Sequence, residues 1–176
     1  MKKEKWLIAI AAGAGAGVLA YSLLSKNIPA GAVAVENFDL ERYLGKWNEI
    51  ARLPNRVEKN LVDVTDTYTA CDDGTYRVVT KAYNRKKKTW KEYSGKVKLA
   101  CNKTVGMLKV SYFEPLYLSY NVLAVDESYK YALVTGSSLH YLWILSKDKF
   151  IPERVKTQFL ALAEAIGFET GKLEWL

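Results

Sequence analysis

The stretch from Asn37 to Arg52, NFDLERYLGKWNEIAR, decides the fold of this chain. A strand-like run begins with Gly45 and Trp47, directly after a Phe-Asp-x-x-x-Tyr sequence. The glycine lets the backbone turn in tightly, and the tryptophan supplies a large, rigid apolar ring. The pattern predicts a strand that starts with a tight turn at Gly45 and carries a large apolar ring at Trp47.

Eight strand-like segments separated by turn signals follow from this start, which is the pattern of an all-β barrel. They lie near 45–54, 62–71, 75–83, 90–99, 106–113, 119–125, 130–136 and 140–147. One helix is predicted after Pro152, where Val155, Phe159, Leu162 and Ile166 recur at helical spacing before Gly167. A single apolar stripe places this helix on the outside of the barrel, and residues 172–176 predict a short ninth strand.

Three ordered motifs between about Val35 and Leu176 resemble the signatures of the lipocalin family. The first is the Gly45-x-Trp47 stretch, the second is Asp126-Glu127-Ser128-Tyr129, and the third is Tyr141 to Ser146. The chain looks most like the bacterial lipocalins of the Blc type. The resemblance implies an eight-stranded up-and-down antiparallel β-barrel, the lipocalin calyx, with one C-terminal α-helix packed outside.

The barrel floor departs from the family pattern at one position. The third signature has an arginine after the serine, and this chain has Lys147 there. A lysine can lie over the Trp47 ring as a cation, but it lacks the planar guanidinium that stacks and donates several hydrogen bonds. We expect Gly45, Trp47 and Lys147 to form the floor, with weaker closure than an arginine gives.

Alternate residues of a barrel strand point inward, so the floor residues set the register of the first and last strands. Trp47 inward makes Glu49 and Ala51 inward as well, and lipocalin-like alignment adds Asp66 and Ala124. The residues expected to line a ligand cavity are Tyr68, Val78, Leu108, Tyr112, Tyr120, Val122, Tyr141 and Trp143. Such apolar walls with a few polar groups are typical of a small-molecule pocket, although aromatic residues also simply fill cores.

The two inward carboxylates allow two interpretations. An inward Glu49 or Asp66 is costly unless it is paired or hydrated. Each therefore bonds a tyrosine hydroxyl or a basic side chain, or one of them meets the polar head of a ligand.

The N-terminal segment is expected to meet the membrane. Trp6 to Leu24 forms 19 residues without a charge, preceded by three lysines. This length can span a bilayer as a hydrophobic helix, and the lysines keep that end cytoplasmic while the body is exported. Residues 1–26 are therefore a signal peptide, cleaved near Ala30-Gly31-Ala32, or a retained anchor; 27–34 form a linker, and 35–176 the lipocalin domain.

Cysteine usage fits an exported protein. The related bacterial lipocalins commonly carry a lipid-bearing cysteine after the signal, but the first cysteine here is Cys71, so we expect no lipid attachment. Cys71 and Cys101 fall in turns at the same end of an up-and-down barrel. An even pair suggests a disulfide bond, and the alternative is two buried free thiols.

Charge does not indicate a nucleic-acid partner. The net charge is +7, of which the N-terminal residues Lys2, Lys3, Lys5 and Lys26 less Glu4 supply +3. The densest basic run, Arg85-Lys86-Lys87-Lys88, joins two strands and is a solvated hairpin tip or a contact with anionic lipid head groups. No nucleic-acid module accompanies the charge.

The resemblance to bacterial lipocalins implies a protein of the bacterial cell envelope that binds a fatty acid or lysophospholipid, and we expect no cofactor and no metal. An enzyme is disfavoured because the single histidine, His140, is expected to face outward, although a Glu49/Asp66 acid–base pair is conceivable. The other alternative is a packed barrel acting as an interaction or membrane-contact module. Its contacts would be the loops Leu53–Arg56, Phe113–Tyr117 and Arg85–Lys88, and a homodimer stays open.

Overall fold

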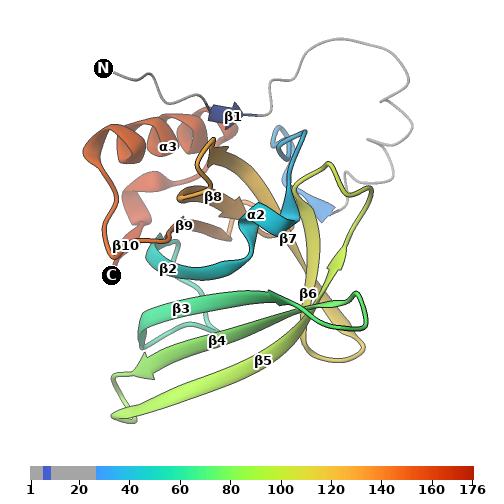
Figure 1. Ribbon diagram of the computed structural model, residues 1–176. Helices are drawn as coiled ribbons and strands as arrows, with labels where there is room; N and C mark the ends of the chain where they lie inside the picture. Colours follow the sequence, from blue (N-terminus) through green and yellow to red (C-terminus); the bar gives the residue numbers. More distant parts are fainter. Residues whose placement is uncertain (1–5, 9–26) are drawn as a thin grey trace.

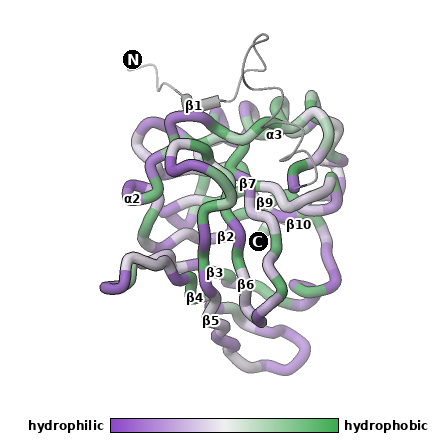
Figure 2. The backbone as a smooth tube through the Cα atoms, turned by 90° about the vertical axis from the view of Figure 1, so that its right-hand side faces the viewer, coloured by the Kyte–Doolittle hydropathy of each residue, from purple (hydrophilic) through white to green (hydrophobic). Residues whose placement is uncertain are grey.

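Eight antiparallel strands close into a barrel in the computed structural model, which describes residues 6–8 and 27–176 (Figure 1). The strands are β2 (Gly45–Arg52), β3 (Leu61–Ala70), β4 (Tyr76–Asn84), β5 (Thr89–Leu99), β6 (Met107–Phe113), β7 (Leu116–Asp126), β8 (Tyr131–Thr135) and β9 (Leu142–Ser146). Each pairs with the next, and β9 pairs back onto β2. The predicted up-and-down barrel is confirmed. Hydrophobic and hydrophilic residues are interspersed along the barrel strands (Figure 2), while β8 and β9 are mostly apolar and buried.

The two ends of the barrel differ. At the closed end lie the turns 71–75, 100–106 and 127–130, together with the short helix α2 (Leu40–Tyr43) that leads into β2. Asp39 caps α2 by accepting a hydrogen bond from the Arg42 amide at 3.3 Å. Gly45 then turns the chain into β2 with φ of +100°, a conformation that favours glycine. At the open end lie the loops 53–60, 85–88, 114–115 and 136–141.

Helix α3 (Glu153–Ile166) packs on the outside of the barrel, as predicted. Val155, Phe159 and Ala163 are buried in an outer cluster with barrel residues such as Leu133 and Ile144. The helix ends at Gly167, where φ is +107°. The 3₁₀ turn η2 (Thr170–Lys172) follows, and the predicted ninth strand is β10 (Glu174–Trp175), which pairs with β2.

The N-terminal part differs from the sequence prediction where it can be compared. Residues Trp6–Ile8 form strand β1, paired antiparallel with the end of β7, so the expected helix is wrong at these positions. The rest of the expected helix, 9–24, lies outside the described residues. None of the helices in the described part of the chain has the length and apolar character to cross a membrane. In the predicted linker 27–34, Ile28, Ala32 and Ala34 are buried in the outer cluster.

Two β-bulges overturn part of the predicted inward set. The register between β2 and β9 shifts between Glu49 and Ala51, and that between β7 and β8 shifts between Val122 and Ala124. A bulge inserts one residue and exchanges the faces beyond it. The inward predictions for Ala51 and Ala124 are therefore wrong, since both pack in the outer cluster, and Arg52 and Val125 take the inner side.

The predicted disulfide is not formed in the structure, where Cys71 and Cys101 are free thiols. Both lie at the closed end, as expected, but their surroundings differ. Cys71 is tied into a tight turn, its amide donating to the Thr75 carbonyl at 2.8 Å. Cys101 packs against the outer cluster, and burial raises the pKa of its thiol.

Candidate ligand-binding site

The closed half of the barrel is filled around Trp47. This side chain is fully buried, stacks on Tyr43 at a centroid distance of 4.6 Å, and donates from Nε1 to the Tyr43 carbonyl at 2.8 Å. Lys147 Nζ lies 5.2 Å from the Trp47 ring centroid and donates to the carbonyls of Arg42 at 3.1 Å and Leu44 at 3.0 Å. The lysine thus joins a cation–π contact to two backbone bonds across the floor.

Three tyrosines build the next layer above the floor. The hydroxyls of Tyr43 and Tyr120 are 2.6 Å apart, and the Tyr68 ring lies 5.7 Å from Tyr43 and 5.8 Å from Tyr120. Burial raises the pKa of all three phenols, so they are neutral hydrogen-bonding groups. Tyr43 reaches this layer from α2, because the short helix places its side chain into the barrel.

Five of the eight sequence-predicted ligand residues belong to this packed base. They are Tyr68, Val78, Leu108 and Val122, all buried, and the half-buried Tyr120. The base is apolar except for the phenol groups. Its side chains are covered by protein, and the half-buried Tyr120 lies at the boundary with the open half.

The other three predicted ligand residues lie in the open half and carry exposed or half-buried ring surface. Tyr112 is 42% exposed and Tyr141 is 37% exposed, while Trp143 is half-buried and stacks on Tyr141 at 6.0 Å. Strand register places Leu118, opposite the inward Val110, on the same inner side, and it is 56% exposed. Water therefore reaches inward side chains at the open end of the barrel.

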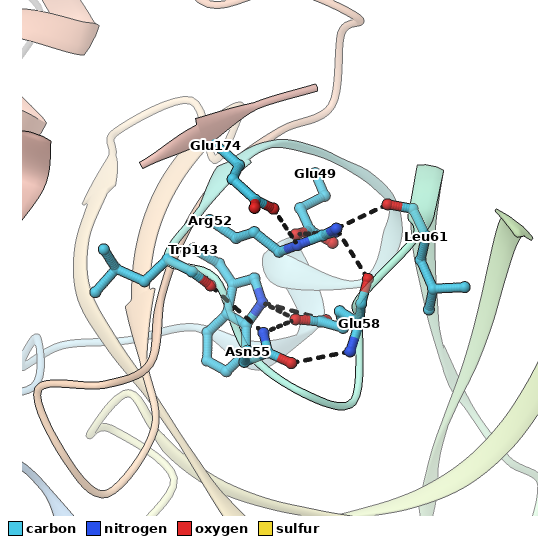
Figure 3. A network of polar contacts seen from close by, with 8 residues as sticks. Glu49, Arg52, Asn55, Glu58, Leu61, Trp143 and Glu174 are labelled. Atoms are coloured by element: carbon cyan, nitrogen blue, oxygen red, sulfur yellow. Dashed lines mark hydrogen bonds and ion pairs between the residues drawn. The ribbon is translucent and has the colours of Figure 1, made fainter. Parts of the chain in front are cut away.

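A polar network stands between the packed base and the open mouth (Figure 3). Arg52 Nη1 donates to Glu49 Oε1 at 3.0 Å, and Nη2 donates to the carbonyls of Glu58 at 3.0 Å and Leu61 at 2.7 Å. Trp143 Nε1 donates to the Glu58 carboxylate at 3.1 Å. Burial raises the pKa of Glu49, the nearby Glu58 charge adds to this, and Arg52 opposes it.

A second polar chain crosses the inner wall from β3 to β6. Thr80 donates to the Asp66 carboxylate, and the Thr80 and Tyr112 hydroxyls are 2.5 Å apart. Burial raises the pKa of Asp66 to about 6, the Thr80 hydrogen bond opposes the shift, and the Glu58 charge adds to it. Among the described residues, these two networks bring together the carboxylates of Glu49, Glu58 and Asp66 and the guanidinium of Arg52.

The raised pKa of Asp66 predicts a stability change with pH. In the unfolded chain the carboxyl loses its proton near its ordinary pKa of 3.8, but in the fold only near 6. The contribution of Asp66 to stability is therefore lost as pH rises through this range, by about 3 kcal/mol. Asp66→Asn keeps an acceptor for Thr80 and removes the loss. In urea unfolding, the free energy of unfolding of the variant should rise relative to that of the parent between pH 4 and pH 6. Above pH 6 the difference between the two should stay constant.

Asp73→Asn is the matched control for this titration. The Thr75 hydroxyl and amide lower the pKa of the exposed Asp73, so its substitution changes stability with the opposite sign as pH rises. A stability difference for Asp66→Asn that does not vary with pH contradicts a raised pKa in the fold.

Comparison with known proteins agrees with this architecture. Residues 38–176 match the family model described as a lipocalin-like domain. The chain is a lipocalin. It is 42% identical over 170 residues to the outer membrane lipoprotein Blc of Citrobacter freundii, covering 97% of this chain and 96% of the relative. The Vibrio cholerae protein of the same name is 39% identical over 148 residues, covering 84% and 86%.

Solved structures share the fold at low sequence identity. Insecticyanin from the tobacco hornworm superposes with a TM-score of 0.68 at 20% identity, covering 84% of each chain. The cockroach allergen Per a 4 superposes with a TM-score of 0.70 at 20% identity, covering 86% of this lipocalin and 94% of the allergen.

Sequence reasoning missed three residues of this lipocalin's interior: Tyr43, Arg52 and Glu58. Arg52 is inward only because the bulge after Glu49 exchanges the faces of β2. Glu58 comes from a loop that folds back until its carboxylate meets Trp143 and Asn55. The Glu49-x-x-Arg52 spacing was the available signal, since such a pair meets across a bulge.

The described interior of the lipocalin contains groups suited to binding. His140 lies exposed in the 136–141 loop, outside the barrel interior. Within the described residues, no cluster of histidine, cysteine and carboxylate side chains could hold a metal ion. The arrangement combines a buried apolar base, aromatic side chains in the open half, and the polar network of Glu49, Arg52 and Glu58 (the polar belt), which can orient a head group.

Proposed function

We propose that this lipocalin binds a single-chain lipid, a fatty acid or a lysophospholipid, for storage or transport at the bacterial cell envelope, without catalysing a reaction. The observation that carries the proposal is the pair of inward rings, Tyr112 and Tyr141, exposed above a buried apolar base. An acyl chain would lie against these two rings and replace the water that reaches them.

The energetics allow useful affinity. Burying about 14 methylenes at about 0.8 kcal/mol each gives about 11 kcal/mol of gross stabilisation. Association costs of roughly 4–15 kcal/mol reduce this, and micromolar binding falls within the resulting range. The polar belt around Glu49, Arg52 and Glu58 would then meet the head group at the level where the barrel opens.

The envelope location rests on two observations. Two relatives that match 97% of this chain are named outer membrane lipoprotein Blc, in Citrobacter freundii and Escherichia coli. The uncharged Trp6–Leu24 segment after three lysines has the composition of a signal peptide or membrane anchor. We propose export, with the barrel on the periplasmic side.

Native mass spectrometry of residues 27–176, purified without detergent and followed by lipid extraction, tests the function. This segment contains all eight barrel strands, α3 and β10. We expect one acyl-chain species per barrel, or uptake of one added fatty acid or lysophospholipid. A barrel that is empty and takes up neither lipid contradicts the proposal.

Trp143→Ala tests the position of the site. The substitution removes half of the Tyr141–Trp143 stack and the bond to Glu58. Loss of about 1–2 kcal/mol of contact should weaken the affinity for a fluorescent acyl probe by about five- to thirtyfold. The control is Trp90→Ala, because Trp90 pairs with the outward Tyr83 on the outer wall and is 62% exposed. Equal affinities for the two variants would place the lipid elsewhere.

A further inference from the structure

The open end of the barrel is strongly basic. Its four loops hold six cations and two carboxylates, a formal charge of +4: Arg56, Lys59, Arg85, Lys86, Lys87 and Lys88 against Glu58 and Glu114. All six cations are exposed. Both carboxylates are engaged, since Glu58 accepts from Trp143 and Glu114 pairs with Lys96 at 2.7 Å. The positive charge of the loops is thus presented to solvent.

The closed end carries the opposite sign. Its turns 71–75, 100–106 and 127–130, the segment 36–44 and the segment 147–152 hold five cations and seven carboxylates, a formal charge of −2. The barrel therefore has a charge gradient along its axis, positive at the open mouth. A molecule of this kind turns its open end toward a negatively charged surface.

Exposed apolar side chains gather at the same end. The five most exposed large apolar residues in the described chain are Val57 at 84%, Phe113 at 82%, Leu116 and Phe150 at 63%, and Trp90 at 62%. Four of them lie in or beside the open-end loops, and Phe150 alone lies at the closed end. Figure 1 shows the β4–β5 hairpin, which carries Trp90 and the basic run, reaching away from α3.

We propose that the open end docks on an anionic lipid bilayer. Lysines and arginines would meet the phosphate head groups, while Phe113, Leu116 and Trp90 enter the interfacial layer, where aromatic and aliphatic tips are stable. Apolar tips between the cations favour a membrane over a nucleic acid, which offers no apolar layer to receive them. The mouth of the barrel would then face the leaflet directly.

Docking goes beyond ligand binding and is tested without a ligand. The full chain is sedimented with vesicles of phosphatidylcholine alone or with about 30% phosphatidylglycerol, at low and high salt. The apolar segment 6–24 can bind both compositions, so the readout is the part of the binding that needs phosphatidylglycerol and falls with salt. We expect Lys86→Glu with Lys87→Glu to reduce this part about tenfold or more.

The matched control makes the same charge change at the closed end, with Lys103→Glu and Lys130→Glu. We expect it to retain the phosphatidylglycerol-dependent binding within about twofold, because these lysines face away from the bilayer. Phe113→Ser should weaken binding at both salt concentrations, and Phe150→Ser should not. Equal losses for the two charge pairs, or binding that ignores phosphatidylglycerol, would overturn the proposal. Retained binding with loss of lipid uptake would separate docking from ligand binding.

Discussion

Trp47→Ala is expected to destabilise the barrel by about 3–5 kcal/mol. Trp47 is fully buried at the floor, where its removal leaves a cavity beneath Tyr43 and ends the Nε1 bond to the Tyr43 carbonyl. The Lys147 ammonium also loses the ring it faces at 5.2 Å. Neighbouring strands are tied by backbone pairing and cannot collapse fully into the space, so the cost falls at the high end of core substitutions.

Chemical unfolding measures this effect as a lower midpoint with an unchanged slope. The midpoint temperature of thermal unfolding should fall by roughly 10 °C for a domain of this size. Trp47→Phe should cost less than half as much, since it keeps a ring on the floor. Trp90→Ala is the surface control and should stay within about 0.5 kcal/mol. A small effect at Trp47 would mean that the floor can repack around the missing ring.

The floor of this barrel could be anticipated from the sequence because it depends only on where two strands begin and end. Gly45 and Trp47 begin β2, and Lys147 directly follows β9, so the closed end of the barrel brings them together. The number and order of the strands could also be predicted, because turn residues in the sequence mark where each strand ends. Each hairpin is local, and an up-and-down barrel joins neighbours in chain order.

The interior of the open half could be predicted only in part. Alternation identified Tyr112 and Trp143, but a bulge changes the faces by inserting one residue, and strand alternation alone does not reveal the bulges near Ile50 and Leu123. Alternation therefore predicted that Ala51 points into the barrel and did not predict that Arg52 does. The position of Glu58 depends on how the 53–60 loop folds over the mouth, which strand periodicity does not describe.

The closed half also holds more protein than the sequence suggested. Tyr68 appeared to line a cavity because its neighbours alternate correctly. In the fold, Tyr43 enters from α2 and packs against it, so the space above Trp47 is occupied by rings from two elements. A four-residue helix outside the barrel strands supplies this side chain, and strand patterns carry no information about it.

Arg52→Met is expected to destabilise the protein by about 3–5 kcal/mol at pH 8. Arg52 is 2% exposed, and its guanidinium bonds Glu49, the Glu58 carbonyl and the Leu61 carbonyl. Methionine keeps much of the volume, but it removes the cation that pairs with Glu49 at 3.0 Å and leaves this buried carboxylate unpaired. Two carbonyls that hold the 53–60 loop to β2 lose their donor as well.

The pH dependence separates charge from packing in this variant. Burial already raises the pKa of Glu49, and removal of Arg52 takes away the charge that lowers it. Glu49 then keeps its proton in the fold to a higher pH than in the unfolded chain. The deficit of Arg52→Met should therefore grow as pH rises from about 5 to 8. Urea unfolding at the two pH values measures the change.

The double variant Glu49→Gln with Arg52→Met decides the origin of the loss. Glutamine cannot ionise, so the pH-dependent part of the deficit should disappear and the remainder should reflect the lost loop bonds. Lys81→Met breaks the exposed Lys81–Glu92 pair at 3.0 Å and should cost less than about 0.5 kcal/mol at either pH. If the double variant keeps the full pH-dependent deficit, a carboxylate other than Glu49 is responsible, and Asp66 is the group to substitute next.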